Sequence, residues 1–168
     1  MPQPVHQPVD VTTPGDREIR VTRVFDAPRQ LIFECHTRPD LVRRWCLGPP
    51  GWTMPVCEID FRVGGRYRYV WRSDADGSEF GFAGEYREID APGRVVHTER
   101  VDGGPEGPDA EALCTLELAE AGGRTTLVQT MRFPTAEARD QALQSGMADG
   151  MGASYDRLEA LAGERAAA

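Results

Sequence analysis

Alternating apolar and polar residues dominate the middle of the chain and predict a sheet. Between residues 66 and 72, Tyr67, Tyr69 and Trp71 alternate with three arginines and a valine, the period of two that a strand with unlike faces requires. Further strands are predicted on this pattern at 17–25, 55–61, 79–89, 94–101, 112–118 and 124–133. Short turn sequences such as DADG, DAPG and EAGG separate several of them, so we expect an antiparallel meander.

Helical spacing replaces this alternation in two places. Pro28 suits the first turn of a helix after the first strand, and a second short helix is predicted over 39–45. After Pro134, one apolar stripe at helical intervals predicts a long helix over 135–162, with a break at 145–146 left open. The order of one strand, two short helices, six strands and a long helix indicates an α+β fold in which the sheet curls around the last helix.

The beginning of the chain has a different composition. Four prolines and few apolar residues within 1–15 predict a flexible proline-rich arm, and 16–168 is expected to form a single domain. No charged-then-apolar leader and no apolar run long enough to span a bilayer is found, so we expect a cytoplasmic protein that does not enter membranes.

Charge and residue usage exclude several functions. The 168 residues hold 19 basic and 27 acidic side chains, and the resulting net charge of -8 repels nucleic acids and anionic lipid surfaces. Every basic residue is an arginine, so Schiff-base chemistry and a lysine-bearing phosphate loop are excluded. The four cysteines form no C-x-x-C pair and are expected to be reduced, and neither a metal nor another cofactor is expected.

Aromatic residues on neighbouring strands provide the candidate binding surface. Tyr69 and Trp71 share one face of a strand, and Phe82 lies on the matching face of the next. Together with residues from the helices they are predicted either to line an internal cavity or to pack as ordinary core; the additional members are Trp45, Met147, Met151 and Tyr155. Glycines beside the two methionines favour a cavity, although they are equally typical of close helix packing.

Polar residues on two later strands could face the same cavity. His97 and Glu99 share a strand face, and Gln129 occupies a later strand. An acid/base pair is one interpretation of this set. Solvent-facing or structurally satisfied side chains are the other interpretation, so the residues alone leave a binding protein and an enzyme both open.

The chain resembles the family of activators of heat-shock-protein ATPase within the START-like, or SRPBCC, superfamily. The resemblance covers roughly residues 17 to 162 and rests on FDAP at 25–28, Trp45 with Gly48-Pro49, CEIDFRVGGRYRY at 57–69, GEYREIDAPGRVVHTE at 84–99, RFPTAEAR at 132–139 and GMADGM at 146–151. Met151 stands where similar proteins usually carry tryptophan, which implies a pocket that is deeper or softer at this point.

The resemblance implies a helix-grip fold, with a curved antiparallel sheet of about six or seven strands around the C-terminal helix. It also implies an internal cavity that binds a small apolar or aromatic metabolite. A cyclase, dehydratase or hydrolase, as in polyketide cyclase-like relatives, is the alternative. A chaperone partner is the least favoured, because the chain has no room for the extra N-terminal domain of the characterised eukaryotic activators. A homodimer stays open.

Overall fold

The computed structural model describes residues 9–167, which form a single sheet and four helices. The strands are β1 (Asp10–Thr12), β2 (Glu18–Phe25), β3 (Trp52–Ile59), β4 (Arg66–Ser73), β5 (Glu79–Asp90), β6 (Arg94–Val101), β7 (Ala112–Ala121) and β8 (Arg124–Arg132). The helices are α1 (Arg29–Thr37), α2 (Pro39–Trp45), α3 (Ala136–Gln144) and α4 (Met147–Ala167). None of these helices is long and apolar enough to cross a membrane.

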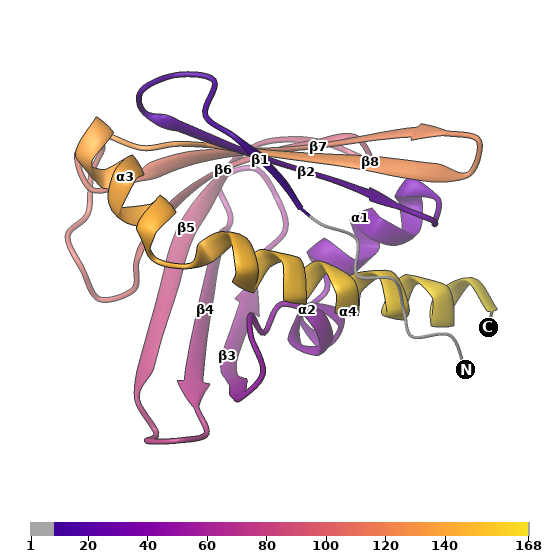
Figure 1. Cartoon of the computed structure of the whole chain (residues 1–168), viewed down its shortest axis with the longest axis horizontal. Coiled ribbons are helices and arrows are strands. Elements are labelled where there is room, and N and C mark those ends of the chain that lie inside the picture. The colour runs from indigo at the N-terminus through magenta and orange to yellow at the C-terminus, as the bar shows by residue number, and fades with distance from the viewer. Residues whose placement is uncertain (1–8, 168) are drawn as a thin grey trace.

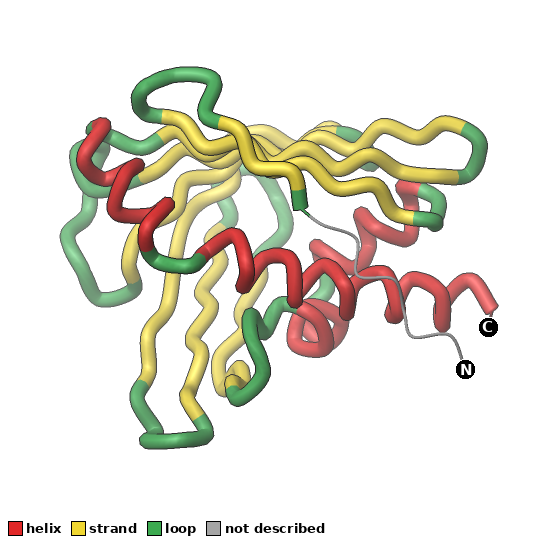
Figure 2. The backbone as a smooth tube through the Cα atoms, viewed as in Figure 1, coloured by secondary structure: helices red, strands yellow, loops and turns green. Residues whose placement is uncertain are grey.

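All neighbouring strands are antiparallel, in the order β1-β2-β8-β7-β6-β5-β4-β3. The sheet bends strongly, so that β2, β7 and β8 form one wing and β3, β4 and β5 form another (Figure 1). The helix α4 runs across the concave side between the two wings, with α1 and α2 beside it (Figures 1 and 2). The α+β, helix-grip prediction is therefore confirmed, with eight strands in place of six or seven.

The additional strand is β1, which falls inside the segment predicted to be a flexible arm. Val11 of β1 lies opposite Val21, and this short strand extends the sheet beyond β2. The flexible-arm prediction is wrong for residues 10–12, because edge pairing with β2 supplies the backbone hydrogen bonds that the local sequence does not. The rest of that prediction falls largely on residues 1–8, which lie outside the described residues.

The C-terminal helical region is divided, as the sequence left open. Thr135 caps α3 by accepting a hydrogen bond from the Ala138 amide at 3.0 Å. Gly146, with φ of +82°, then separates α3 from α4 in a backbone conformation that favours glycine. The long helix thus begins at Met147, and α3 contributes no buried residue to the core.

The densest core lies under the β2 and β8 wing. Its members with no exposed surface include Ile19, Phe25, Leu127 and Leu158, and α4 packs mainly against α1, α2 and β2. Arg23 shares the inward face of β2 and is only 3% exposed. Its guanidinium is placed 2.9 Å from Asp156 and 3.0 Å from Glu159, so α4 neutralises the one charge that interrupts the apolar pattern of β2.

Candidate functional site

A glycine on β5 allows a tyrosine to reach across the sheet. Tyr67 of β4 lies opposite Gly84 of β5, and a Cβ on Gly84 would lie only 2.8 Å from Cε1 of Tyr67 and would overlap the Thr98 carbonyl. The absence of a side chain on Gly84 therefore lets the Tyr67 ring lie over β5. In this way the Tyr67 hydroxyl reaches β6, one strand beyond the immediate neighbour of β4.

The Tyr67 hydroxyl joins a compact polar network on β6. It donates to the Thr98 carbonyl at 2.7 Å, and Nδ1 of His97 lies 3.0 Å from both that carbonyl oxygen and the Tyr67 oxygen. A carbonyl only accepts, so the arrangement that satisfies all three atoms has the proton of His97 on Nδ1. Burial lowers the pKa of His97, which keeps the ring neutral and leaves Nε2 as a free acceptor.

Glu99 lies half-buried on the concave face of β6. Small residues flank it in the register of the sheet, since Ala112 of β7 is its partner and Gly84 lies on the β5 side. Among the described residues no hydrogen bond or ion pair to its carboxylate is formed. Burial alone raises the pKa of Glu99 from 4.5 to about 7, and no cation opposes the shift. Carboxyl groups perturbed in this way are concentrated at functional sites.

A second histidine, His36, lies near this network and was not among the predicted site residues. Nδ1 of His36 donates to the Ile32 carbonyl at 2.8 Å, which leaves its Nε2 as an acceptor. Burial lowers the pKa of His36 to about 4, and the nearby His97 contributes to this shift. No local pattern in the sequence selects His36, because its contact with Trp45, at 4.8 Å between ring centroids, depends on how α1 and α2 pack.

Three predicted aromatic residues lie together on the β3–β5 wing. The rings of Trp71 and Phe82 are 5.8 Å apart, and those of Tyr69 and Trp71 are 6.0 Å apart. All three are only partly buried. The Trp71 indole donates to the Cys46 carbonyl at 2.6 Å, which fixes the end of α2 to β4. These residues form an incompletely covered aromatic surface on the concave side.

Trp45 and Tyr155, by contrast, belong to the packed core. Their rings stack at 6.1 Å, each residue is 4% exposed, and the Trp45 indole donates to the Cys35 carbonyl at 2.8 Å. That bond satisfies one of the carbonyls left free in the last turn of α1. For these two residues the structure favours the core-packing alternative.

The remaining predicted residues lie around the start of α4 and on β8. Met147 and Met151 are partly buried against the core, and Gln129, also partly buried, lies opposite Val21 and Leu116.

Gly150 of α4 allows close packing against the loop that follows α2. A Cβ added to Gly150 would lie 3.6 Å from the ring of Pro49, so this loop approaches the helix closely where the helix has no side chain. The loop is held further by Arg157, which donates to the Gly48 carbonyl at 2.6 Å. Close helix packing, one of the two alternatives for these glycines, is therefore what Gly150 provides.

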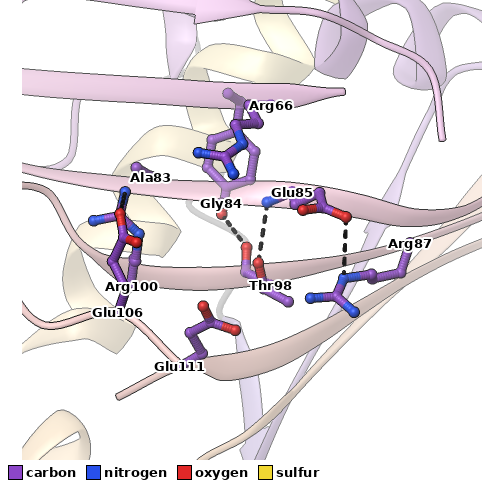
Figure 3. A pocket seen from close by; sticks show the side chains of 10 residues that line it. Arg66, Ala83, Gly84, Glu85, Arg87, Thr98, Arg100, Glu106 and Glu111 are labelled. Carbon is purple, nitrogen blue, oxygen red and sulfur yellow. Dashed lines mark hydrogen bonds and ion pairs between the residues drawn. The ribbon is translucent and has the colours of Figure 1, made fainter. Parts of the chain in front are cut away.

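Two hollows among the described residues lie on the outer face of the sheet. One, of about 80 Å³, is behind Tyr67 and Thr98 and is surrounded by charged side chains such as Arg66, Glu85 and Glu111 (Figure 3). The other, of about 400 Å³, is lined by residues of β2, β7 and β8 that include Glu117, together with Gly93 of the turn between β5 and β6. None of the ten predicted site residues lines either hollow, so the internal cavity stays a prediction.

The described residues offer no metal site. They contain no group of three or more histidine, cysteine and acidic side chains close enough to hold an ion. All four cysteines are free thiols, and burial raises the pKa of Cys46 to about 12 and that of Cys57 to about 11, which keeps both protonated and poorly nucleophilic.

A curved sheet gripping a C-terminal helix, with polar groups on its concave face, defines a START-like (SRPBCC) protein. The family described as Activator of Hsp90 ATPase homolog 1-like protein matches residues 26–163, and the chain belongs to this family. The resemblance inferred from the sequence is thereby confirmed.

Solved structures of bacterial proteins share the fold over nearly the whole chain. A protein from Rhodobacter sphaeroides is 29% identical with a TM-score of 0.82, and the match covers 91% of this chain and 97% of that one. Protein Ms6760 from Mycobacterium smegmatis is 25% identical with a TM-score of 0.80, over 92% and 96% of the two chains. A protein from Nitrosomonas europaea, 23% identical with a TM-score of 0.81 over 93% and 100%, shows the fold alone. No curated protein matches the chain significantly.

Proposed function

We propose that the chain binds a small, largely apolar or aromatic molecule between the concave face of the sheet and α4. The observation that carries this proposal is Glu99, a half-buried carboxyl group on the concave face that makes no hydrogen bond or ion pair among the described residues and whose pKa is raised by burial to about 7. A carboxyl group that is partly withdrawn from water and has no partner in the fold gains a hydrogen bond when a ligand supplies the donor.

The surroundings of Glu99 support the same proposal. The small side chain of Ala112 lies beside Glu99 on β7, and Tyr69, Trp71 and Phe82 give an aromatic surface that is only partly covered. Apolar walls with a few polar groups are typical of small-molecule sites. A ligand there would lie on the opposite face of the sheet from the two hollows described above.

Catalysis at the same place is the second candidate, and one observation favours it. A carboxyl group with a pKa near 7 can both give and accept a proton at neutral pH, which suits a general acid/base. A cyclase or dehydratase would use Glu99 in this role, with Nε2 of His97 accepting a hydrogen bond from the substrate.

Native mass spectrometry of protein purified from its own host tests both candidates. We expect a small molecule to co-purify with the wild type and to be recovered chemically unchanged. Glu99→Gln should weaken its retention, whereas Glu117→Gln, an exposed carboxyl on the outer face, should leave retention unaltered. Conversion of the recovered molecule by the wild type but not by Glu99→Gln would establish the enzyme. Protein that carries no molecule, and that no apolar compound stabilises, would contradict the proposal.

A further inference from the structure

We infer that the polar end of the bound molecule is a hydrogen-bond donor, and that the best donor is a protonated amine attached to a flat aromatic body. This inference rests on the proposed function and specifies its ligand class. It follows from the hydrogen-bonding groups on the concave side. Several acceptors there have no partner among the described residues, whereas several donors are already bound to backbone carbonyls.

The two histidines each present an acceptor. Nδ1 of His36 is committed to the Ile32 carbonyl and Nδ1 of His97 to the Thr98 carbonyl, at 2.8 and 3.0 Å. Each ring therefore carries its proton on the committed nitrogen and keeps a lone pair on Nε2. Neither Nε2 has a partner among the described residues. A ligand that approaches these rings gains a hydrogen bond only if it donates one.

Glu99 adds a carboxylate that no arginine neutralises. The chain has no lysine, and the arginine buried on the inward face of β2, Arg23, is held by Asp156 and Glu159. Arg157 donates to the Gly48 carbonyl. A carboxylic acid entering this region would place like charges together without a cation between them, which is strongly unfavourable in a buried site.

The protein's own donors are mostly bound to backbone carbonyls. The indoles of Trp45 and Trp71 donate to Cys35 and Cys46, and the hydroxyl of Tyr67 donates to Thr98. Three strong donors are thus unavailable to a ligand. The hydroxyls of Tyr69 and Tyr86 share a hydrogen bond with each other. These two hydroxyls, the Gln129 amide and the Tyr155 hydroxyl can each donate or accept, so they do not reverse the balance.

An amine satisfies this environment better than a neutral donor. Its positive charge compensates Glu99, which a hydroxyl does not do, and an ammonium group gains further from nearby aromatic faces such as those of Tyr69 and Trp71. Hydrogen bonds to charged groups are about twice as strong as neutral ones. The expected order of affinity is therefore amine, then alcohol, then acid.

Three probes with one aromatic body test this order: 2-naphthylmethylamine, 2-naphthylmethanol and 2-naphthoic acid. Calorimetric titration of the full chain at pH 8 should give an affinity for the amine at least about 10-fold above that for the acid. Glu99→Gln should lower the affinity for the amine by about 10-fold or more and the affinity for the alcohol by less than about 3-fold. Glu117→Gln, which changes an exposed carboxyl of the outer face, should alter none of them.

The outcomes separate this inference from the proposed function. If the acid binds as tightly as the amine, and Glu99→Gln still changes binding, the binding function stands. The inference that the ligand must donate a hydrogen bond is then wrong. If amine binding is insensitive to Glu99→Gln, the inference is also wrong. If none of the three probes binds the wild type, both fail. Because Glu99→Gln could alter the fold, its circular dichroism spectrum and melting temperature are compared with those of Glu117→Gln.

Discussion

The two wings of the sheet contribute very different surfaces to the same concave side. Under β2 and β8, side chains such as Ile19, Phe25 and Leu127 have no exposed surface and pack against α1 and α4. On the β4–β6 side, Tyr69 and Trp71 keep partial exposure beside polar groups. One wing is therefore built for stability, and the other holds features that weaken packing and are typical of a binding surface.

Buried charge is handled differently in the two regions. Arg23, under the β2 wing, is held by two carboxylates of α4 that remain in contact with solvent. Glu99, on β6, has no such partner, and its pKa rises instead. The first charge is stabilised by the fold itself, whereas the second has no compensating group among the described residues.

The largest effect is expected from truncating the packed wing. Leu158→Ala should lower the free energy of unfolding by about 3 to 5 kcal/mol, because a fully buried leucine leaves a cavity that the core does not refill. Phe82→Ala, which truncates a partly buried side chain of the β3–β5 wing, should cost less, about 1 to 2 kcal/mol. Urea denaturation followed by circular dichroism measures both. Equal losses would contradict the contrast between the wings.

The pH dependence of stability should contain a contribution from Glu99. Its folded pKa of about 7 exceeds the ordinary 4.5, so the folded state holds this proton more tightly, and stability falls as pH rises from about 4.5 to about 7. Glu99→Gln removes that loss. The free energy of unfolding of the variant should therefore increase relative to that of the wild type across this pH range, and the difference should become constant above pH 7. The pH-dependent gain is limited to about 3 kcal/mol.

The two histidines act in the opposite direction, so the difference between variant and wild type must be measured. The pKa of His36 is lowered from 6.5 to about 4, so its effect is a loss of stability as pH falls through that interval. Urea denaturation of wild type, Glu99→Gln and Glu117→Gln between pH 4.5 and 8 isolates the Glu99 contribution. A difference that does not vary with pH would show that Glu99 has an ordinary pKa.

The fold was predictable from the sequence because its elements have strong local patterns. Alternation defined seven strands, and the change to helical spacing after Pro134 defined the terminal helices. The missed strand, Asp10–Thr12, has only one apolar residue, Val11, and forms through pairing with β2. A segment of three residues with one apolar side chain carries no alternation pattern that could indicate its pairing with β2.

The site was predictable only in part, because it depends on contacts between distant elements. Residues on one strand face, such as Glu99 and Trp71, could be selected by alternation. His36 could not, since its neighbours come from α2 and β6. Tyr67 was recognised as an inward aromatic residue, but its bond to Thr98 depends on Gly84, a residue of a different strand.

A smaller effect is expected from removing the hydroxyl that crosses β5. Tyr67→Phe should lower the free energy of unfolding by about 1 to 2 kcal/mol, because the buried Thr98 carbonyl loses its shorter hydrogen bond. Tyr155→Phe is the matched control, since no hydrogen bond of that hydroxyl is found among the described residues. Tyr155→Phe should lower the free energy of unfolding, measured by urea denaturation, by less than half as much as Tyr67→Phe. The reverse order would show that the hydrogen bond of the Tyr67 hydroxyl does not stabilise the fold.

The smallest effect concerns the attachment of α2 to the open wing. Trp71→Phe removes the indole that donates to the Cys46 carbonyl at 2.6 Å, and we expect a loss of about 1 kcal/mol in the free energy of unfolding. Trp52→Phe is the control, because its indole makes no hydrogen bond among the described residues although its ring lies 5.3 Å from Phe80. Hydrogen exchange gives the sharper readout: amides of α2 should exchange faster in Trp71→Phe, while those of α4 keep wild-type rates. Unchanged exchange in α2 would mean that the bond does not hold the helix against β4.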